Sequence, residues 1–168
     1  MMLNTVTQEV LARGYIFQTI ASKTSPTWAI FFSAVLFVLY HAGGLRGAPL
    51  ATINVFGAGV LFGVAFHLSG NLWLPISIHF AWNFLLGPVL GLSISGHAWR
   101  NGWRLLAIQG PSLFTGGAFG LEGSLVVTLT TVLSTALIVV WYRNQVAGKE
   151  TSECADHQAE QRAMANSR

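Results

Sequence analysis

The chain has 168 residues, a size typical of one domain. Hydrophobic residues make up 52% of it and charged residues only 9%, against about 25% charged residues in ordinary soluble proteins. This composition excludes a disordered chain over most of the length and argues against an ordinary soluble domain. The net charge of +3 comes from scattered basic residues that form no basic stripe, so nucleic acid is not an expected partner.

Charge is concentrated at the C-terminal end of the chain. More than half of the charged residues lie in 143–168, whereas all six tryptophans and all eleven phenylalanines lie in 1–142. This division predicts a membrane-embedded domain over 1–142 and a polar, disordered tail over 143–168. The single cysteine, Cys154, lies in that tail, so the sequence offers no intramolecular disulfide and no CxxC motif.

The apolar runs predict an all-α, polytopic membrane protein of about five helices. In chain order, the expected helices cover 3–20, 27–40, 50–68, 72–92 and 125–141. The first is amphipathic, and the last is uncharged and closes on an interfacial Trp-Tyr-Arg. A long glycine-rich connection over 93–122 joins the fourth helix to the fifth.

Polar side chains on apolar helices are costly in lipid, and those that occur usually face the protein interior and serve a function. Such residues occur on, or at the end of, three of the expected helices, each with a partner four positions away on the same face: Glu9 with Arg13, His41 with the aromatic Phe37, and His79 with Asn83. A carboxylate can act as a general base on water, imidazoles can bind a metal or form hydrogen bonds, and an amide can stabilise an oxyanion. The three faces together predict hydrolysis in a water-filled membrane cavity.

A structural interpretation of these residues stays open. A membrane histidine can serve only to join two helices, and Glu9 and Arg13 can simply neutralise each other. Four further titratable residues are expected to have no chemical role: His67, His97, His157 and Glu122. Glu122 precedes the last helix, where an acid complements the helix dipole.

Three motifs, in this order along the chain, resemble those of the CPBP family of intramembrane proteases, which includes the type II CAAX prenyl endopeptidases and bacteriocin-processing or immunity proteins. The family pattern E-E-x-x-x-R is matched by QEVLAR at 8–13, F-x-x-x-H by FVLYH at 37–41, and H-x-x-x-N by HFAWN at 79–83. The segment 115–123 resembles prokaryotic members. Each motif is weak alone, but their order and membrane context are specific.

The resemblance implies the catalytic part of a larger helical bundle, in a multi-pass protein of a prokaryotic cell membrane. It implies an endopeptidase that activates water against membrane-associated, prenylated or leader peptides. The implied catalytic residues are Glu9, His41, His79 and Asn83, with Gln8, Arg13 and Phe37 supporting them. The family leaves two mechanisms open: zinc or another divalent metal held by His41 and His79, or a metal-free glutamate mechanism. The expected partners are a peptide or protein substrate and the lipid bilayer.

Gln8 departs from the family pattern, in which the first of the two acids is the expected general base. An amide cannot take a proton, so either Glu9 replaces that base or the chain is an inactive relative that binds a peptide or partner, as an immunity protein does. A third interpretation, haem binding or transport with His41 and His79 as a ligand pair, rests on the histidines alone.

Overall fold

The computed structural model describes residues 1–45, 47–99, 103, 105–106 and 108–166, with side chains as far as residue 148. In this part of the chain every regular element is helical, which confirms the all-α class. The longer helices are α1 Met2–Glu9, α3 Pro26–His41, α4 Pro49–Ser69, α5 Trp73–Phe84 and α7 Leu125–Asn166. Shorter elements are α2 Gln18–Ala21, α6 Ser112–Thr115, the π-helices η1 Val10–Phe17 and η2 Leu85–Val89, and the 3-10 turns η3 Gly117–Phe119 and η4 Leu121–Gly123.

The first helix expected from the sequence is one continuous helical segment made of α1, η1 and α2. Its middle part, η1, has the wider turn of a π-helix, a form that often occurs at functional sites. Prolines mark the starts of the next two helices, because Pro26 and Pro49 each occupy the first turn, where no backbone N–H is needed. Gly70 ends α4 in the left-handed conformation typical of a helix C-terminus.

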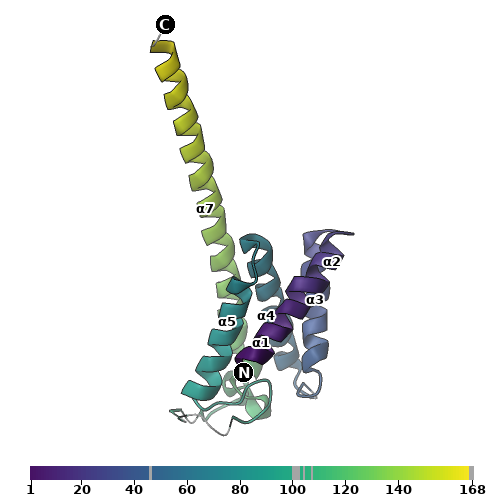
Figure 1. Cartoon of the computed structure of the whole chain (residues 1–168). Coiled ribbons are helices and arrows are strands. Elements are labelled where there is room, and N and C mark those ends of the chain that lie inside the picture. Colours follow the sequence, from purple (N-terminus) through teal and green to yellow (C-terminus); the bar gives the residue numbers. More distant parts are fainter. Residues whose placement is uncertain (46, 100–102, 104, 107, 167–168) are drawn as a thin grey trace.

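Helix α4 is the centre of the bundle and packs on α3, α5 and α7. Its contact with α3 depends on small residues, since a Cβ atom built on Gly59 would lie 2.8 Å from the Cα atom of Ala34. In Figure 1 the segment α1 lies beside α5 and α3, while α7 extends far beyond the other helices.

Among the described residues, two helices are long and apolar enough to cross a membrane: Pro49–Ser69 and Leu125–Gly148. The apolar helix Pro26–His41 is shorter. Five membrane-spanning helices and a multi-pass topology therefore stay a prediction.

The C-terminal segment is helical as far as Asn166, and the division of the chain at residue 142 stays a prediction. Helix α7 continues without a break from Leu125 to Asn166, so no helix end marks the boundary expected at residue 142. The polar part of α7 is rich in Ala, Glu and Gln and contains no proline, and these residues favour a helix. Ser167 and Arg168 of the expected tail lie outside the described residues.

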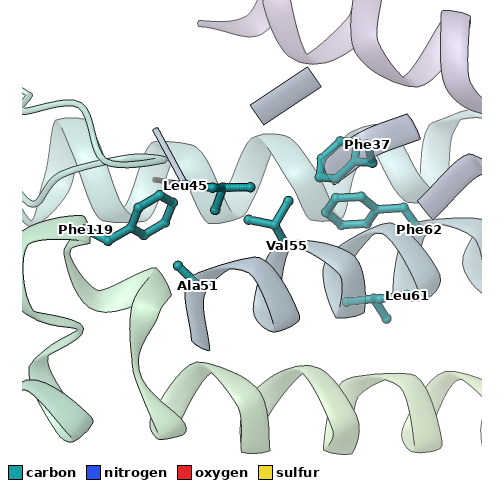
Figure 2. Close-up of a cluster of buried hydrophobic side chains, with 7 residues drawn as sticks. All are labelled: Phe37, Leu45, Ala51, Val55, Leu61, Phe62 and Phe119. Atoms are coloured by element: carbon teal, nitrogen blue, oxygen red, sulfur yellow. The ribbon is translucent and has the colours of Figure 1, made fainter. Parts of the chain in front are cut away.

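A cluster of buried hydrophobic side chains connects the bundle to the glycine-rich connection (Figure 2). Its members come from α3, α4, the loop between them and the 3-10 turn η3: Phe37, Leu45, Ala51, Val55, Leu61, Phe62 and Phe119. Phe119 packs into this cluster from residues 115–124, and this places that segment against the first turns of α4. The connection is thereby brought to the face of the bundle that carries the polar residues.

Candidate active site

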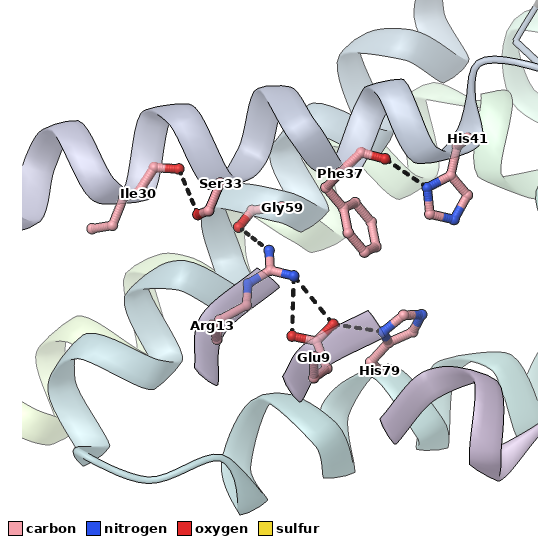
Figure 3. Close-up of polar contacts among 8 residues, drawn as sticks. All are labelled: Glu9, Arg13, Ile30, Ser33, Phe37, His41, Gly59 and His79. Atoms are coloured by element: carbon pink, nitrogen blue, oxygen red, sulfur yellow. Dashed lines mark hydrogen bonds and ion pairs between the residues drawn. The ribbon is translucent and has the colours of Figure 1, made fainter. Parts of the chain in front are cut away.

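Glu9 joins two of the three motifs in a buried polar cluster (Figure 3). Its Oε2 atom lies 3.0 Å from Nη1 of Arg13, one helical turn away, and its Oε1 atom lies 2.8 Å from Nδ1 of His79 on α5. Glu9 and Arg13 are both fully buried. Removal of two charges from water is costly, so each needs the other as a partner.

Further contacts offset the cost of burying the Arg13 guanidinium group. Its Nη2 atom donates a 2.7 Å hydrogen bond to the carbonyl oxygen of Gly59 on α4. The guanidinium carbon lies 5.0 Å from the ring centre of Phe37 and 5.4 Å from that of Phe62, within range of a cation–π interaction. Arg13 therefore links the first helical segment to α3 and α4 and holds Glu9 at the centre of the site.

His79 is fixed by its hydrogen bond and by two aromatic rings. Phe62 stacks on the imidazole with ring centres 4.9 Å apart, and Phe37 meets it edge-on at 5.6 Å. Because the Glu9 carboxylate faces Arg13 and acts as an acceptor, Nδ1 of His79 is the donor. Nε2 of a neutral His79 ring is then left as a proton acceptor.

His41 has the same tautomer for a different reason. Its Nδ1 atom lies 2.7 Å from the backbone oxygen of Phe37, which can only accept, so Nδ1 carries the proton. The Phe37 ring contacts both imidazoles, with centres 4.6 Å from His41 and 5.6 Å from His79. The F-x-x-x-H motif thus orients one histidine through the backbone of Phe37 and packs both through its ring.

The residues of the three motifs meet between two cavities. One, of about 410 Å³, lies among α4, α5 and α7 and is mainly apolar, with Val55, Phe62 and Val127 in its walls. The other, of about 420 Å³, is lined by more polar groups that include Asn4, Gln8 and Tyr40. Four residues line both cavities: His41, His79, Asn83 and Ser95.

Gln8 lines the polar cavity rather than the ion-pair cluster. The residue is 7% exposed, and its Oε1 atom has no hydrogen-bond partner among the described residues. Buried polar atoms are rarely left unpaired unless a water or ligand meets them. The structure thus separates the two neighbours: Glu9 pairs with Arg13 and His79, and Gln8 presents an amide to the cavity.

Several residues of the site, Glu122 and Asn54 among them, are not sequence-based candidates. Glu122, interpreted above as a helix-dipole partner, lines the apolar cavity with His41, His79 and Asn83. Asn54 is a buried amide within the apolar helix α4. The sequence signal for Asn54 was available, because a lone amide in such a helix is itself costly. The other histidines with described side chains, His67 and His97, are exposed, and His97 lies at the rim of the polar cavity.

The donor set does not form a typical metal site. Within the described part of the chain, no group of three or more His, Cys, Asp or Glu side chains is placed to hold a metal ion. Nδ1 of His79 faces Glu9, and Nδ1 of His41 faces a backbone carbonyl, so only the two Nε2 atoms are available as ligands. A catalytic zinc site normally needs three protein ligands.

Comparison with known protein families identifies a relationship. The family described as "Type II CAAX prenyl endopeptidase Rce1-like" matches residues 1–85, about half of the chain. This range contains all three motifs, but it ends before Ser95 and Glu122. No curated protein and no solved structure matches the chain.

Proposed function

Because the chain belongs to the Rce1-like type II CAAX prenyl endopeptidase family, we propose that it hydrolyses peptide bonds of membrane-associated peptides, with the Glu9–His79 pair activating the water. The substrates are prenylated C-terminal peptides or small leader peptides. The observation that carries this proposal is the 2.8 Å contact between Glu9 Oε1 and His79 Nδ1. A carboxylate that orients an imidazole leaves the opposite nitrogen as a general base.

The reaction has two proton transfers. Nε2 of His79 takes a proton from a water molecule as the water oxygen attacks the carbonyl carbon of the peptide bond. Glu9 stabilises the imidazolium that forms, and the amide of Asn83 donates a hydrogen bond to the oxyanion of the tetrahedral intermediate. His79 then returns the proton to the leaving amine, the C–N bond breaks, and the products are an acid and an amine.

The remaining motif residues hold the water and the base. The unpartnered Oε1 of Gln8 and the free Nε2 of His41 are acceptors for the second hydrogen of the water. Arg13 holds the Glu9 carboxylate through their ion pair, and Phe37 packs both imidazoles. This mechanism uses no metal ion, in keeping with the two available imidazole ligands.

The test is cleavage of a farnesylated C-a-a-X peptide and of a leader peptide by detergent-purified protein. Wild type is compared with Glu9→Gln, which keeps the shape of the side chain but removes the carboxylate. Cleavage by wild type and a loss of at least about 100-fold in Glu9→Gln support the proposal. Equal cleavage by both proteins contradicts the role of Glu9. His67→Gln, an exposed histidine in the same domain, is the matched control.

A second candidate function is peptide binding without cleavage, and the buried amide of Gln8 favours it. In this case Glu9 only compensates Arg13, and the cavity lacks the carboxylate that the family pattern has at position 8. The Gln8→Glu variant separates the two candidates. An inactive wild type that gains cleavage through Gln8→Glu supports the binding function, whereas an active wild type excludes it.

A further inference from the structure

A tight turn in the glycine-rich connection forms part of the wall between the two cavities. Ile94 and His97 pair through two backbone hydrogen bonds, of 3.0 and 2.9 Å, around Ser95 and Gly96. The φ angles of Ser95 and Gly96 are 50° and 78°, and positive φ at both central positions is typical of a type I′ turn. Ser95 is the only described non-glycine residue with positive φ, so its conformation needs support from its surroundings.

The turn fits closely against the end of the F-x-x-x-H helix. A Cβ atom built on Gly44 would lie 2.6 Å from the backbone oxygen of Ser95, so only glycine allows this approach. A Cβ atom on Gly96 would lie 3.1 Å from the ring of Phe119. The turn therefore packs against Gly44, which lies three residues after His41, and against Phe119.

Glu122 holds this turn to α5 through its side chain. One carboxyl oxygen accepts a 3.0 Å hydrogen bond from the indole Nε1 of Trp82, and the other accepts a short hydrogen bond from the backbone N–H of Ser95. Trp82 precedes Asn83, which lines both cavities together with Ser95. The Glu122 side chain thus connects Ser95 with Trp82, the residue before Asn83, which is the proposed oxyanion donor.

The backbone around Glu122 is itself anchored. Nδ2 of Asn54 donates 2.8 Å hydrogen bonds to the backbone oxygens of Glu122 and Ser124, and Oδ1 of Asn54 accepts a 2.7 Å bond from Thr128. A buried amide with this many partners fixes η4 between α4 and α7. The Glu122 carboxyl group is therefore presented to the turn from a rigid support.

We propose that Glu122 is a positioning residue of the site. It holds the Ser95–Gly96 turn in the wall of the apolar cavity, where the peptide binds, and thereby sets the affinity for the peptide. This inference rests on the proposed function, because it takes a membrane-associated peptide as the molecule that binds in the cavity. Glu122 lies outside the matched range 1–85, so the family motifs do not contain it. It has no part in the proton transfers, so its removal affects KM and not kcat.

The chemistry of the two donors provides a specific test. In Glu122→Gln the amide has one acceptor oxygen, so one of the two N–H donors must face the NH₂ group. The turn is released, and we expect KM, or Kd for a non-cleavable reduced-amide analogue of the farnesylated peptide, to rise about tenfold while kcat stays within about twofold. Hydrogen–deuterium exchange over 93–97 rises in parallel.

A second substitution restores the contact. Trp82→Phe in the Glu122→Gln background removes the indole donor, so the amide oxygen can serve Ser95 and the NH₂ group meets no donor. We expect exchange over 93–97 and the peptide affinity to return to within about threefold of wild type. General destabilisation would instead make the double variant worse than either single variant, and that result would overturn the inference.

The outcomes of this experiment separate the two proposals. If wild type binds the analogue but does not cleave the peptide, the proposed hydrolysis is wrong. The exchange and affinity data then decide the role of Glu122 by themselves. Unchanged exchange or unchanged affinity in Glu122→Gln overturns the inference, even if wild type is an active peptidase. Glu153→Gln, in the polar part of the chain, is the control for the loss of one carboxylate.

Discussion

His79 Nδ1 and Glu9 Oε1 lie 2.8 Å apart, although 70 positions separate the two residues in the chain. The contact selects the tautomer of His79 and leaves Nε2 free to act on water. We expect His79→Gln to lower kcat by about 10² to 10⁴ with little change in KM, because the base is lost and the cavity keeps its shape. Steady-state cleavage assays with His67→Gln as control test this, and an equal loss in the control would contradict it.

Gly59 supports the site through the backbone. Its carbonyl accepts from Arg13, and a Cβ atom at this position would overlap Ala34 on α3. We expect Gly59→Ala to separate α3 from α4, to lower stability by about 1–3 kcal/mol and to reduce cleavage. Gly57→Ala is the control on the same helix, since its Cβ atom would meet only Thr131, at 3.4 Å. Similar melting temperatures for the two variants would contradict this explanation.

Asn54 connects α4, η4 and α7 through three hydrogen bonds. Asn54→Leu leaves two backbone carbonyls and the Thr128 hydroxyl without this partner, so we expect a loss of about 3 kcal/mol. At about 2–4 °C per kcal/mol for a chain of this size, the melting temperature falls by about 6–12 °C. Thr128→Val removes only one of these bonds, and its effect should be about a third as large. Thermal unfolding in detergent measures both.

Chelation tests the metal-free mechanism directly. Only two imidazole nitrogens are available as ligands, so we expect 1,10-phenanthroline and EDTA to leave the cleavage rate unchanged. If chelation abolishes cleavage and added zinc restores it, the zinc expectation holds and the proposed mechanism is wrong. Metal analysis of the purified protein provides an independent measurement.

Glu122 makes the free energy of unfolding depend on pH, and the direction of its pKa shift sets the direction of that dependence. Burial is the largest effect on this carboxyl group and raises its pKa above the ordinary value of 4.5, against the opposing effects of the Ser95 and Trp82 hydrogen bonds and of His79. The folded protein therefore binds this proton more tightly than the unfolded chain. This contribution to stability is complete below pH 4.5 and is lost as the pH rises through the raised pKa.

We therefore expect the melting temperature of wild type, relative to Glu122→Gln, to fall as the pH rises from about 4 to 8. Thermal scans of both proteins in the same detergent at several pH values measure this difference. A constant difference over the whole range would show that Glu122 titrates at its ordinary pKa.

The sequence was sufficient to predict the helices that form the bundle. The helices expected over 27–40 and 50–68 end within a few residues of the observed α3 and α4, whereas α7 continues well beyond the expected end at residue 141. The i,i+4 spacings also predict the Glu9–Arg13 pair and the shared face of His79 and Asn83, because spacing in a helix determines direction. The motif residues do meet around one site, while their catalytic roles stay proposals.

The missed features depend on long-range contacts. Nothing near Glu122 in the sequence indicates Trp82 or Ser95, which are 40 and 27 positions away, so the sequence alone points to a local role at the helix start. The π-helical turn at Val10–Phe17 has no clear sequence signal either. Residues 143–166 are helical, in line with their helix-favouring composition, whereas their polarity predicts a disordered tail.

The pair of cavities has a consequence for turnover. A hydrolase consumes one water molecule per cycle, and a long peptide that fills a single-entrance site would block its replacement. Here His79 and Asn83 are reached from both sides, from the apolar cavity and from the one beside Gln8 and Tyr40. Under the proposed function, a peptide seated in the apolar cavity would leave the polar cavity to water. Water supply and substrate exchange would then be independent steps, and a substitution that narrows one cavity would slow only one of them.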